Sequence, residues 1–119
     1  MQLSFQLFAL TALGGSIGAV TRLAVSQFVL PGPLGIFALN VVGALALGFV
    51  VTFVEERSPL FAVFLGAGVL GALTTFSTFA GDAVRLLTTS PGVAFAYVLG
   101  SVAFAMLAFM LGAQVGRAL

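Results

Sequence analysis

Residues 68–79, with the sequence GVLGALTTFSTF, are the most informative part of this sequence. Glycines open it, and four hydroxyl side chains then follow within five residues. Glycine and β-branched threonine both weaken a helix, so we predict a helix break between Gly71 and Thr75. Carbonyl groups freed at such a break suit a hard cation, and the N-terminus of the next half-helix suits an anion. The alternative is a continuous helix whose hydroxyls bond back to carbonyls one turn earlier. The hydroxyl-bearing residues are Thr74, Thr75, Ser77 and Thr78.

The sequence around this stretch is too apolar for a soluble domain. Of the 119 residues, 61% are apolar and 6% are charged, whereas about a quarter of a soluble domain is charged. A helix needs about 20 mostly apolar residues to cross a bilayer, and loops rich in proline, glycine and charge divide the chain into four such segments. The predicted spans are about residues 2–29, 34–54, 60–87 and 93–119.

We therefore predict an all-α membrane protein, a single transmembrane domain with four transmembrane helices per subunit and the third helix broken. Four buried helices of a soluble protein are the alternative. Soluble surface helices carry a polar stripe, and these segments have none.

The composition also excludes several kinds of function. The chain has no cysteine and no histidine, which removes disulfides, the usual ligands of zinc, copper and haem, and the commonest general base. A net charge of +1 offers no basic surface for nucleic acid. No catalytic arrangement stands out, so we predict that the protein is not an enzyme. The apolar start, residues 3–13, is not expected to be a cleavable signal, because no Lys or Arg precedes it and it runs on into a longer helix.

Small residues are spaced for close contact between helices. A separation of four residues lets helix backbones approach where lipid supplies no hydrophobic drive. Glycine is common in membrane helices generally, so the pattern supports packing without identifying the partner. The pairs are Gly14 and Gly18, Ala44 and Gly48, Ala67 and Gly71, and Gly112 and Gly116.

The basic residues give no preferred orientation in the membrane. Four spans put both termini on one side, together with Arg57 and Arg117, and leave Arg22 and Arg85 for the other side. Because the positive-inside rule is balanced, we predict insertion in both directions and an antiparallel, dual-topology homodimer with a two-fold axis in the membrane plane. A weak bias set by another feature is the alternative.

An amide and two aromatic rings inside the spans are candidates for ion binding. Asn40 is the only strongly polar side chain in the middle part of the second span. Its amide can donate to an anion or hydrogen-bond another helix. Phe76 and Phe79 lie three apart on one helix face. The positive edges of their rings could attract a small anion, although phenylalanines at this spacing usually pack against lipid or other helices.

The remaining polar residues of the spans do not indicate a function by themselves. Arg22 could draw anions to a pore mouth or extend to the membrane interface. Asp82 and Arg85 are three apart and can pair on one helix. Tyr97 and Ser101 are four apart on one face of the fourth helix, where they would extend a polar track or hydrogen-bond across the bundle.

Three motifs of this chain resemble those of the bacterial fluoride channel family known as Fluc or CrcB. Residues 14–22, GGSIGAVTR, resemble the family's first-helix motif. Residues 35–43, GIFALNVVG, resemble its second-helix motif with the pore asparagine, and residues 71–79, GALTTFSTF, resemble its third-helix break. The resemblance covers essentially the whole chain, and the third motif is the most specific.

The resemblance implies a fluoride-specific ion channel that relieves fluoride toxicity by passive export across the bacterial cytoplasmic membrane. It implies a dual-topology antiparallel homodimer with two pores and a structural sodium ion, not transported, at its centre. Backbone carbonyls that correspond to Gly71 and Thr74 of each subunit would hold the sodium. Arg22 matches the family arginine near the pore entrance. The residues that match the pore are Asn40, Phe76, Phe79, Ser77, Thr78, Tyr97 and Ser101.

Two residues depart from the family's pattern. Ile36 stands where threonine is frequent, which removes a hydroxyl near the start of the second helix. Asp82 stands where glutamate is usual, so that carboxylate has a shorter reach.

Two other functions fit the composition. A small multidrug-resistance-type proton-coupled exporter is also a four-helix dual-topology dimer, but it needs a membrane-embedded carboxylate, and the first span has no acidic residue. A non-conducting structural bundle of membrane helices would explain the glycines but not the cluster of threonine, serine and phenylalanine.

Overall fold

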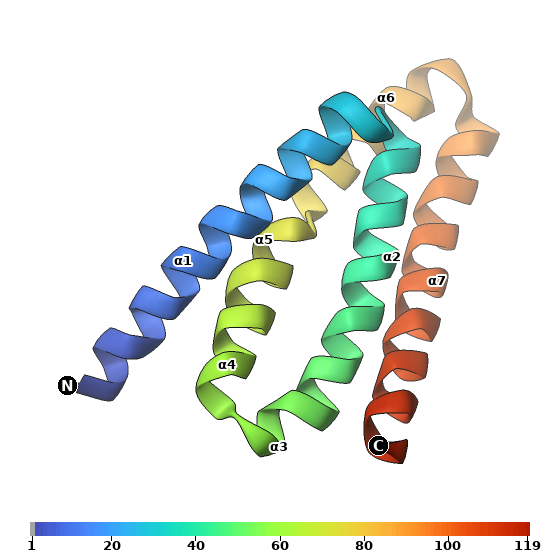
Figure 1. Cartoon of the computed structure of the whole chain (residues 1–119). Helices are drawn as coiled ribbons and strands as arrows, with labels where there is room; N and C mark the ends of the chain where they lie inside the picture. The colour runs from blue at the N-terminus through green and yellow to red at the C-terminus, as the bar shows by residue number, and fades with distance from the viewer. Residues whose placement is uncertain (1) are drawn as a thin grey trace.

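The structure is a computed structural model that describes residues 2–119. It contains four helical spans, each long and apolar enough to cross a membrane (Figure 1). This confirms the prediction of an all-helical protein with four apolar spans. The spans are Gln2–Val29, Pro33–Arg57, Pro59–Thr89 and Pro91–Ala118.

Several spans change helix type along their length. The first consists of α1 (Gln2–Ala24) and the π-helical η1 (Val25–Val29). The second consists of α2 (Pro33–Phe49), the π-helical η2 (Val50–Val54) and α3 (Glu55–Arg57). The third contains α4 (Pro59–Val63), the π-helical η3 (Phe64–Leu70), α5 (Gly71–Leu73) and α6 (Phe76–Thr89). The fourth is α7 (Pro91–Ala118).

Prolines begin three of the helices, which explains most of the differences from the predicted boundaries. Pro33, Pro59 and Pro91 are the first residues of α2, α4 and α7, although the sequence analysis placed them in loops. Proline fits the first helical position because its missing N–H would have no partner there and its φ angle is already helical. The second span also continues to Arg57, beyond the predicted end near residue 54.

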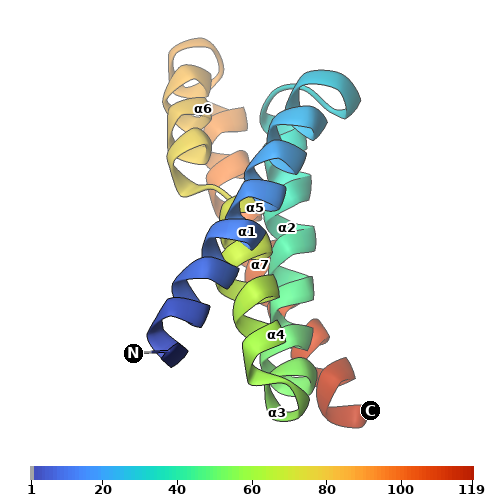
Figure 2. The same ribbon diagram turned by 60° about the vertical axis from the view of Figure 1, so that its left-hand side comes forward.

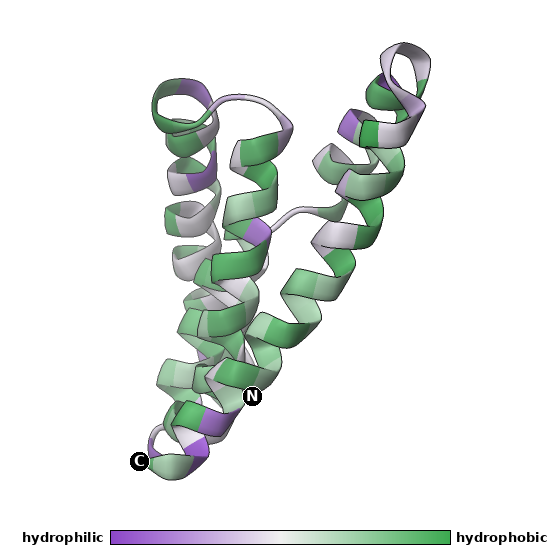
Figure 3. Ribbon diagram, turned by 90° about the vertical axis from the view of Figure 1, so that its right-hand side faces the viewer, coloured by the Kyte–Doolittle hydropathy of each residue, from purple (hydrophilic) through white to green (hydrophobic). Residues whose placement is uncertain are grey.

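The four spans pack as two close pairs. α7 runs beside α2, and α1 crosses η3, as Figures 1 and 2 both show. Both termini lie at the end of the bundle where α3 meets α4, and α6 lies at the opposite end. Hydrophobic residues cover the helices along their length, and most hydrophilic residues gather toward the two ends (Figure 3).

Glycines make the close pairs possible. A methyl group at Gly112 would press on the main-chain carbonyl of Leu45 in α2. A methyl group at Gly14 would lie 2.9 Å from the Cα of Gly68. The glycine pairs of the first and fourth spans therefore pack as their spacing predicts. The pair formed by Ala67 and Gly71 differs, because both residues are exposed on the outside of the chain.

Candidate functional site

The centre of the third span contains two residues with extended backbone. α5 ends at Leu73 and α6 begins at Phe76. Between them, Thr74 has φ −82° and ψ 154°, and Thr75 has φ −150° and ψ 126°. The Thr74 N–H still bonds the Leu70 carbonyl as in a helix, at 3.1 Å. The Thr75 N–H and the Thr74 carbonyl lose their helical partners, so they need others.

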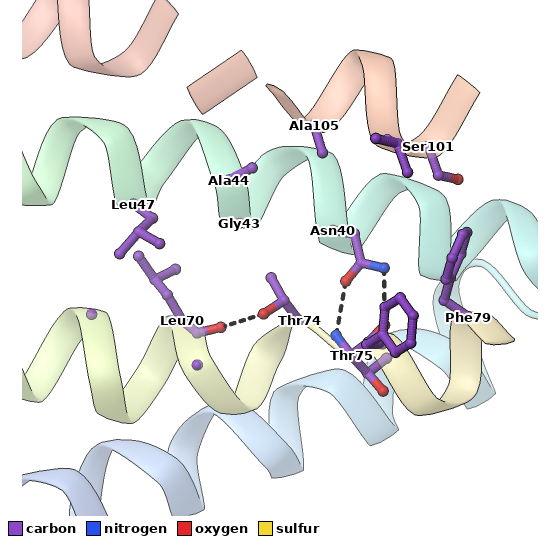
Figure 4. Close-up of a pocket in the computed structure, with 14 residues that line it drawn as sticks. Asn40, Gly43, Ala44, Leu47, Leu70, Thr74, Thr75, Phe79, Ser101 and Ala105 are labelled. Atoms are coloured by element: carbon purple, nitrogen blue, oxygen red, sulfur yellow. Dashed lines mark hydrogen bonds between the residues drawn. The ribbon is translucent and has the colours of Figure 1, made fainter. Parts of the chain in front are cut away.

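The side chain of Asn40 binds both main-chain groups of Thr75 (Figure 4). The Thr75 N–H donates to Asn40 Oδ1 at 2.8 Å, and Asn40 Nδ2 donates to the Thr75 carbonyl at 3.1 Å. The amide thus pairs with Thr75 much as a neighbouring strand would. Of the two interpretations of Asn40, the structure contains the interhelical hydrogen bond. The two bonds to Thr75 use one N–H of the amide group and leave the other N–H for a further acceptor.

The threonine hydroxyls stabilise the helix ends on either side. Thr75 is the N-cap of α6, because its Oγ1 accepts from the Thr78 N–H at 3.2 Å. The same hydroxyl lies 3.3 Å from Ser77 Oγ. Thr74 Oγ1 donates to the Leu70 carbonyl at 2.9 Å, which is the back-bond to the preceding turn considered for these residues.

Two carbonyls lose their helical donors at this point. In a continuous helix the Gly71 carbonyl would accept from the N–H of Thr75, and the Thr74 carbonyl from the N–H of Thr78. Here Thr75 donates to Asn40 and Thr78 donates to the Thr75 hydroxyl. The oxygens of Gly71 and Thr74 therefore keep lone pairs that a cation can use.

Arg22 reaches the same part of the third span from α1. Its Nε donates to the carbonyl of Ala72 at 2.9 Å. This contact belongs to neither interpretation made from the sequence, which considered a pore mouth and the membrane interface. It satisfies the carbonyl that lies directly after Gly71.

An open groove of about 350 Å³ brings many of the predicted site residues together. Phe79 is 8% exposed, whereas Phe76 is 79% exposed at the rim. Their ring centroids are 5.7 Å apart. The predicted site residues that line the groove are Asn40, Gly71, Thr74, Phe76, Phe79 and Ser101.

Two buried hydroxyls of α7 have no hydrogen-bond partner within residues 2–119. They are Tyr97 Oη and Ser101 Oγ. Tyr97 packs on Phe79 with ring centroids 5.2 Å apart, and Ser101 is 5% exposed. Because an unpaired buried hydroxyl is costly, these two atoms can hydrogen-bond a ligand that enters beside Phe79.

A second, more polar pocket of about 540 Å³ lies next to the end of α1. It contains Arg22, Thr78, Asp82 and Arg85. Arg85 donates to Asp82 Oδ1 at 2.9 Å, so the pair expected on α6 is present. The Arg85 side chain is 80% exposed, and the Asp82 side chain is 8% exposed. Ile36, which replaces the family threonine, is buried and also lines this pocket.

Sequence reasoning missed the central position of Thr75. It was counted among the hydroxyls, but its main chain binds Asn40 and its side chain caps α6. A threonine just before a helix, three residues ahead of the N–H that it caps, is the signal that could have indicated this. The pairing of Gly68 with Gly14 was also missed.

Comparison with known proteins places this architecture in a family. Residues 9–113 match the family model described as CrcB-like protein, Camphor Resistance (CrcB). The chain is 40% identical to the fluoride-specific ion channel FluC of Thermosipho melanesiensis, over 92% of this chain and 95% of that protein. It is also 40% identical to the FluC protein of Thermotoga maritima, over 89% of this chain and 91% of the relative. The FluC protein of Paracoccus denitrificans is 39% identical, over 94% of this chain and 95% of the relative. These matches confirm the resemblance seen in the three motifs, and the chain belongs to the CrcB-like protein family.

Proposed function

We propose that this protein is a fluoride channel that lets fluoride leave the cell passively. The observation that carries the proposal is the identity of about 40% with proteins named fluoride-specific ion channel, over at least nine-tenths of those relatives. The protein is a channel and not an enzyme. Fluoride that enters as the neutral weak acid ionises inside the cell, and an anion pathway then lets it leave down its electrochemical gradient.

The pathway that we propose runs along the groove beside Phe76 and Phe79. Ring edges carry partial positive charge, and the unpaired hydroxyls of Tyr97 and Ser101 can donate to an anion. The remaining N–H of Asn40 can donate as well. A narrow pathway selects an ion by replacing its water shell with such groups. Ser77 and Thr78 lie at the start of α6, and Thr78 lines the polar pocket that contains Arg22.

We further propose that two copies assemble antiparallel and that the third helix acts as a broken membrane helix. Gly71 and Ala67 are exposed on the outside of the chain, with the small spacing that suits a helix contact. Arg57 and Arg117 lie at the end of the bundle that carries the termini, and Arg22 and Arg85 lie toward the other end. This balance supports insertion in both directions, into what we take to be the bacterial cytoplasmic membrane.

A structural sodium ion fits the carbonyls of Gly71 and Thr74. Both residues line the open groove, and the N–H groups that would otherwise bond their oxygens are directed elsewhere. Two carbonyls from each of two copies would give an all-oxygen site, which suits a hard cation. When bound, the ion would supply positive charge at the centre of the dimer.

Flux from liposomes tests the channel proposal. Purified protein in vesicles loaded with fluoride should release it far faster than protein-free vesicles, because bare lipid is a poor path for the anion. The same vesicles loaded with chloride should empty slowly. Equal release of the two halides would contradict a fluoride-selective pathway.

A single introduced cysteine tests dual topology. The chain has no cysteine of its own, and Ser58 is exposed in the turn between α3 and α4. In sealed vesicles made from the membranes of the expressing cells, a membrane-impermeant maleimide should label about half of the Ser58→Cys protein, since balanced charge allows both orientations. Labelling of nearly all or nearly none would show one orientation and exclude the antiparallel dimer.

A proton-coupled exporter receives no support from the acidic residues. Glu55 and Glu56 lie in α3 at the end of the bundle, and the one carboxylate on α6, Asp82, is paired with Arg85.

A further inference from the structure

The contact between Arg22 and Ala72 suggests a structural use for the arginine. The Arg22 side chain is half-buried, and its Nε donates to the Ala72 carbonyl at 2.9 Å. In a continuous helix this carbonyl would accept from the N–H of Phe76, four residues on. Phe76 instead begins α6 after two extended residues. The arginine therefore supplies a donor where the helix has lost its own.

Glycines in α1 allow this helix to lie close enough to the third span for Arg22 to reach the Ala72 carbonyl. Gly14, Gly18 and Arg22 follow one another at intervals of four and share one helix face. A methyl group at Gly18 would lie 2.9 Å from the carbonyl carbon of Val69 and 3.0 Å from the Leu73 nitrogen. Only glycine allows α1 to approach the third span this closely, and the next residue on the same face is Arg22.

The bond constrains the carbonyls on either side of Ala72. Successive carbonyl oxygens lie about 100° apart around a helix axis. With the Ala72 oxygen held toward α1, the Gly71 oxygen must lie on another side, and Gly71 lines the open groove. The opposite side of the extended segment is held by Asn40 from α2 through Thr75. Two helices thus hold the segment through two side chains.

We propose that Arg22 is a positioning residue: its Nε–H holds the Ala72 carbonyl toward α1 and thereby sets the directions of the Gly71 and Thr74 carbonyls. The charge of the guanidinium is secondary in this role, and the hydrogen bond is essential. If Arg22 instead attracted anions to a pore mouth, its charge would be essential and its hydrogen bond to Ala72 would be secondary.

Two substitutions separate the hydrogen bond from the charge. The Nε2 of glutamine is four bonds from Cα, as is the Nε of arginine, so Arg22→Gln can keep the bond to Ala72 while losing the charge. Arg22→Met loses both at similar length. Arg117→Met makes the same change at an exposed arginine in the last turn of α7 and serves as the matched control.

The measurement is amide hydrogen exchange of the full-length protein in lipid nanodiscs. Mass spectrometry then follows a peptide that covers residues 70–80. In Arg22→Met, exchange of this peptide should be about ten- to a hundredfold faster than in wild type, the effect of losing a hydrogen bond to a charged group. Arg117→Met should exchange within about threefold of wild type. Arg22→Gln, which keeps a neutral hydrogen bond, should exchange at least about threefold more slowly than Arg22→Met. Peptides from α7 provide the internal reference.

The outcomes are distinct. Unchanged exchange in Arg22→Met would overturn the proposal, and so would exchange in Arg22→Gln as fast as in Arg22→Met, because the charge would then be the important property. If Arg22→Met does not fold, Arg22→Gln alone decides, since wild-type exchange supports the bond and fast exchange refutes it. The readout requires neither sodium nor fluoride, so its failure leaves the flux test of the proposed function unaffected.

Discussion

Replacing Asn40 with aspartate tests whether its carboxamide lies beside the ion pathway. The exchange keeps the shape of the side chain and keeps an oxygen to accept from the Thr75 N–H at 2.8 Å. It replaces the Nδ2 donor, now 3.1 Å from the Thr75 carbonyl, with a second oxygen. The variant therefore changes one hydrogen bond and one charge while leaving the packing of α2 unaltered.

The lost hydrogen bond acts on stability, and the new charge sets the size of the effect on flux. Loss of the donor leaves a carbonyl oxygen without its partner, which costs about 1–3 kcal/mol of stability. A carboxylate also repels fluoride by about 2–4 kcal/mol at 8 to 4 Å if the effective dielectric constant is about 20. At tenfold per 1.36 kcal/mol, we expect Asn40→Asp to slow fluoride flux by about 30- to 900-fold.

Fluoride release from liposomes, recorded with a fluoride electrode, measures this loss. Gln114→Glu is the matched control, because it makes the same amide-to-carboxylate exchange at an exposed position near the end of α7. Size-exclusion chromatography in detergent should give the same elution volume for the variant and the wild type. Flux of Asn40→Asp within about twofold of wild type, in protein that elutes normally, would refute the placement of Asn40 beside the pathway.

Three further perturbations test the groove, the helix packing and the cation. Phe79→Ile should slow fluoride flux about tenfold by removing a ring edge worth about 1.4 kcal/mol to the ion, whereas Phe8→Ile, at a position that is 76% exposed and far from the groove in sequence, should leave flux unchanged. Gly112→Ala should lower the free energy of unfolding by about 1–3 kcal/mol, because the methyl group would push α7 away from α2. Gly100→Ala meets no atom within 4 Å, so its thermal midpoint in detergent should not fall, and an equal fall in both variants would contradict the packing argument. If sodium binds at the dimer centre, replacing it with a bulky organic cation should lower the thermal midpoint, since a ligand at a hundredfold excess over its dissociation constant stabilises by about 2.7 kcal/mol.

The spans were predictable because their signal is repeated along the whole chain. Composition and segment length alone identify four apolar helices, and the structure contains them. The ends were less predictable, because a proline indicates a helix start as well as a helix stop. Pro59 and Pro91 each follow a single non-helical serine and begin the next helix, so the turns are shorter than the loops that the sequence suggests.

For the candidate site, the sequence indicates residue types but not their contacts. The expectation of a break between Gly71 and Thr75 rests on residue types, and the extended residues are Thr74 and Thr75. Which side chains would bind the freed groups depends on how α1 and α2 approach the third span. The bonds from Asn40 to Thr75 and from Arg22 to Ala72 connect residues 35 and 50 positions apart, and no local pattern encodes such distances.

The pairing of Asn40 with Thr75 also affects how water can enter the protein. A non-helical segment inside a bilayer usually has to be hydrated, because its amide and carbonyl groups find nothing else to bind. Here one carboxamide replaces that hydration for Thr75, because it binds both main-chain groups of this residue. Water that reaches this part of the protein can then solvate the open groove, where Gly71 and Ser101 lie, without being needed at Thr75.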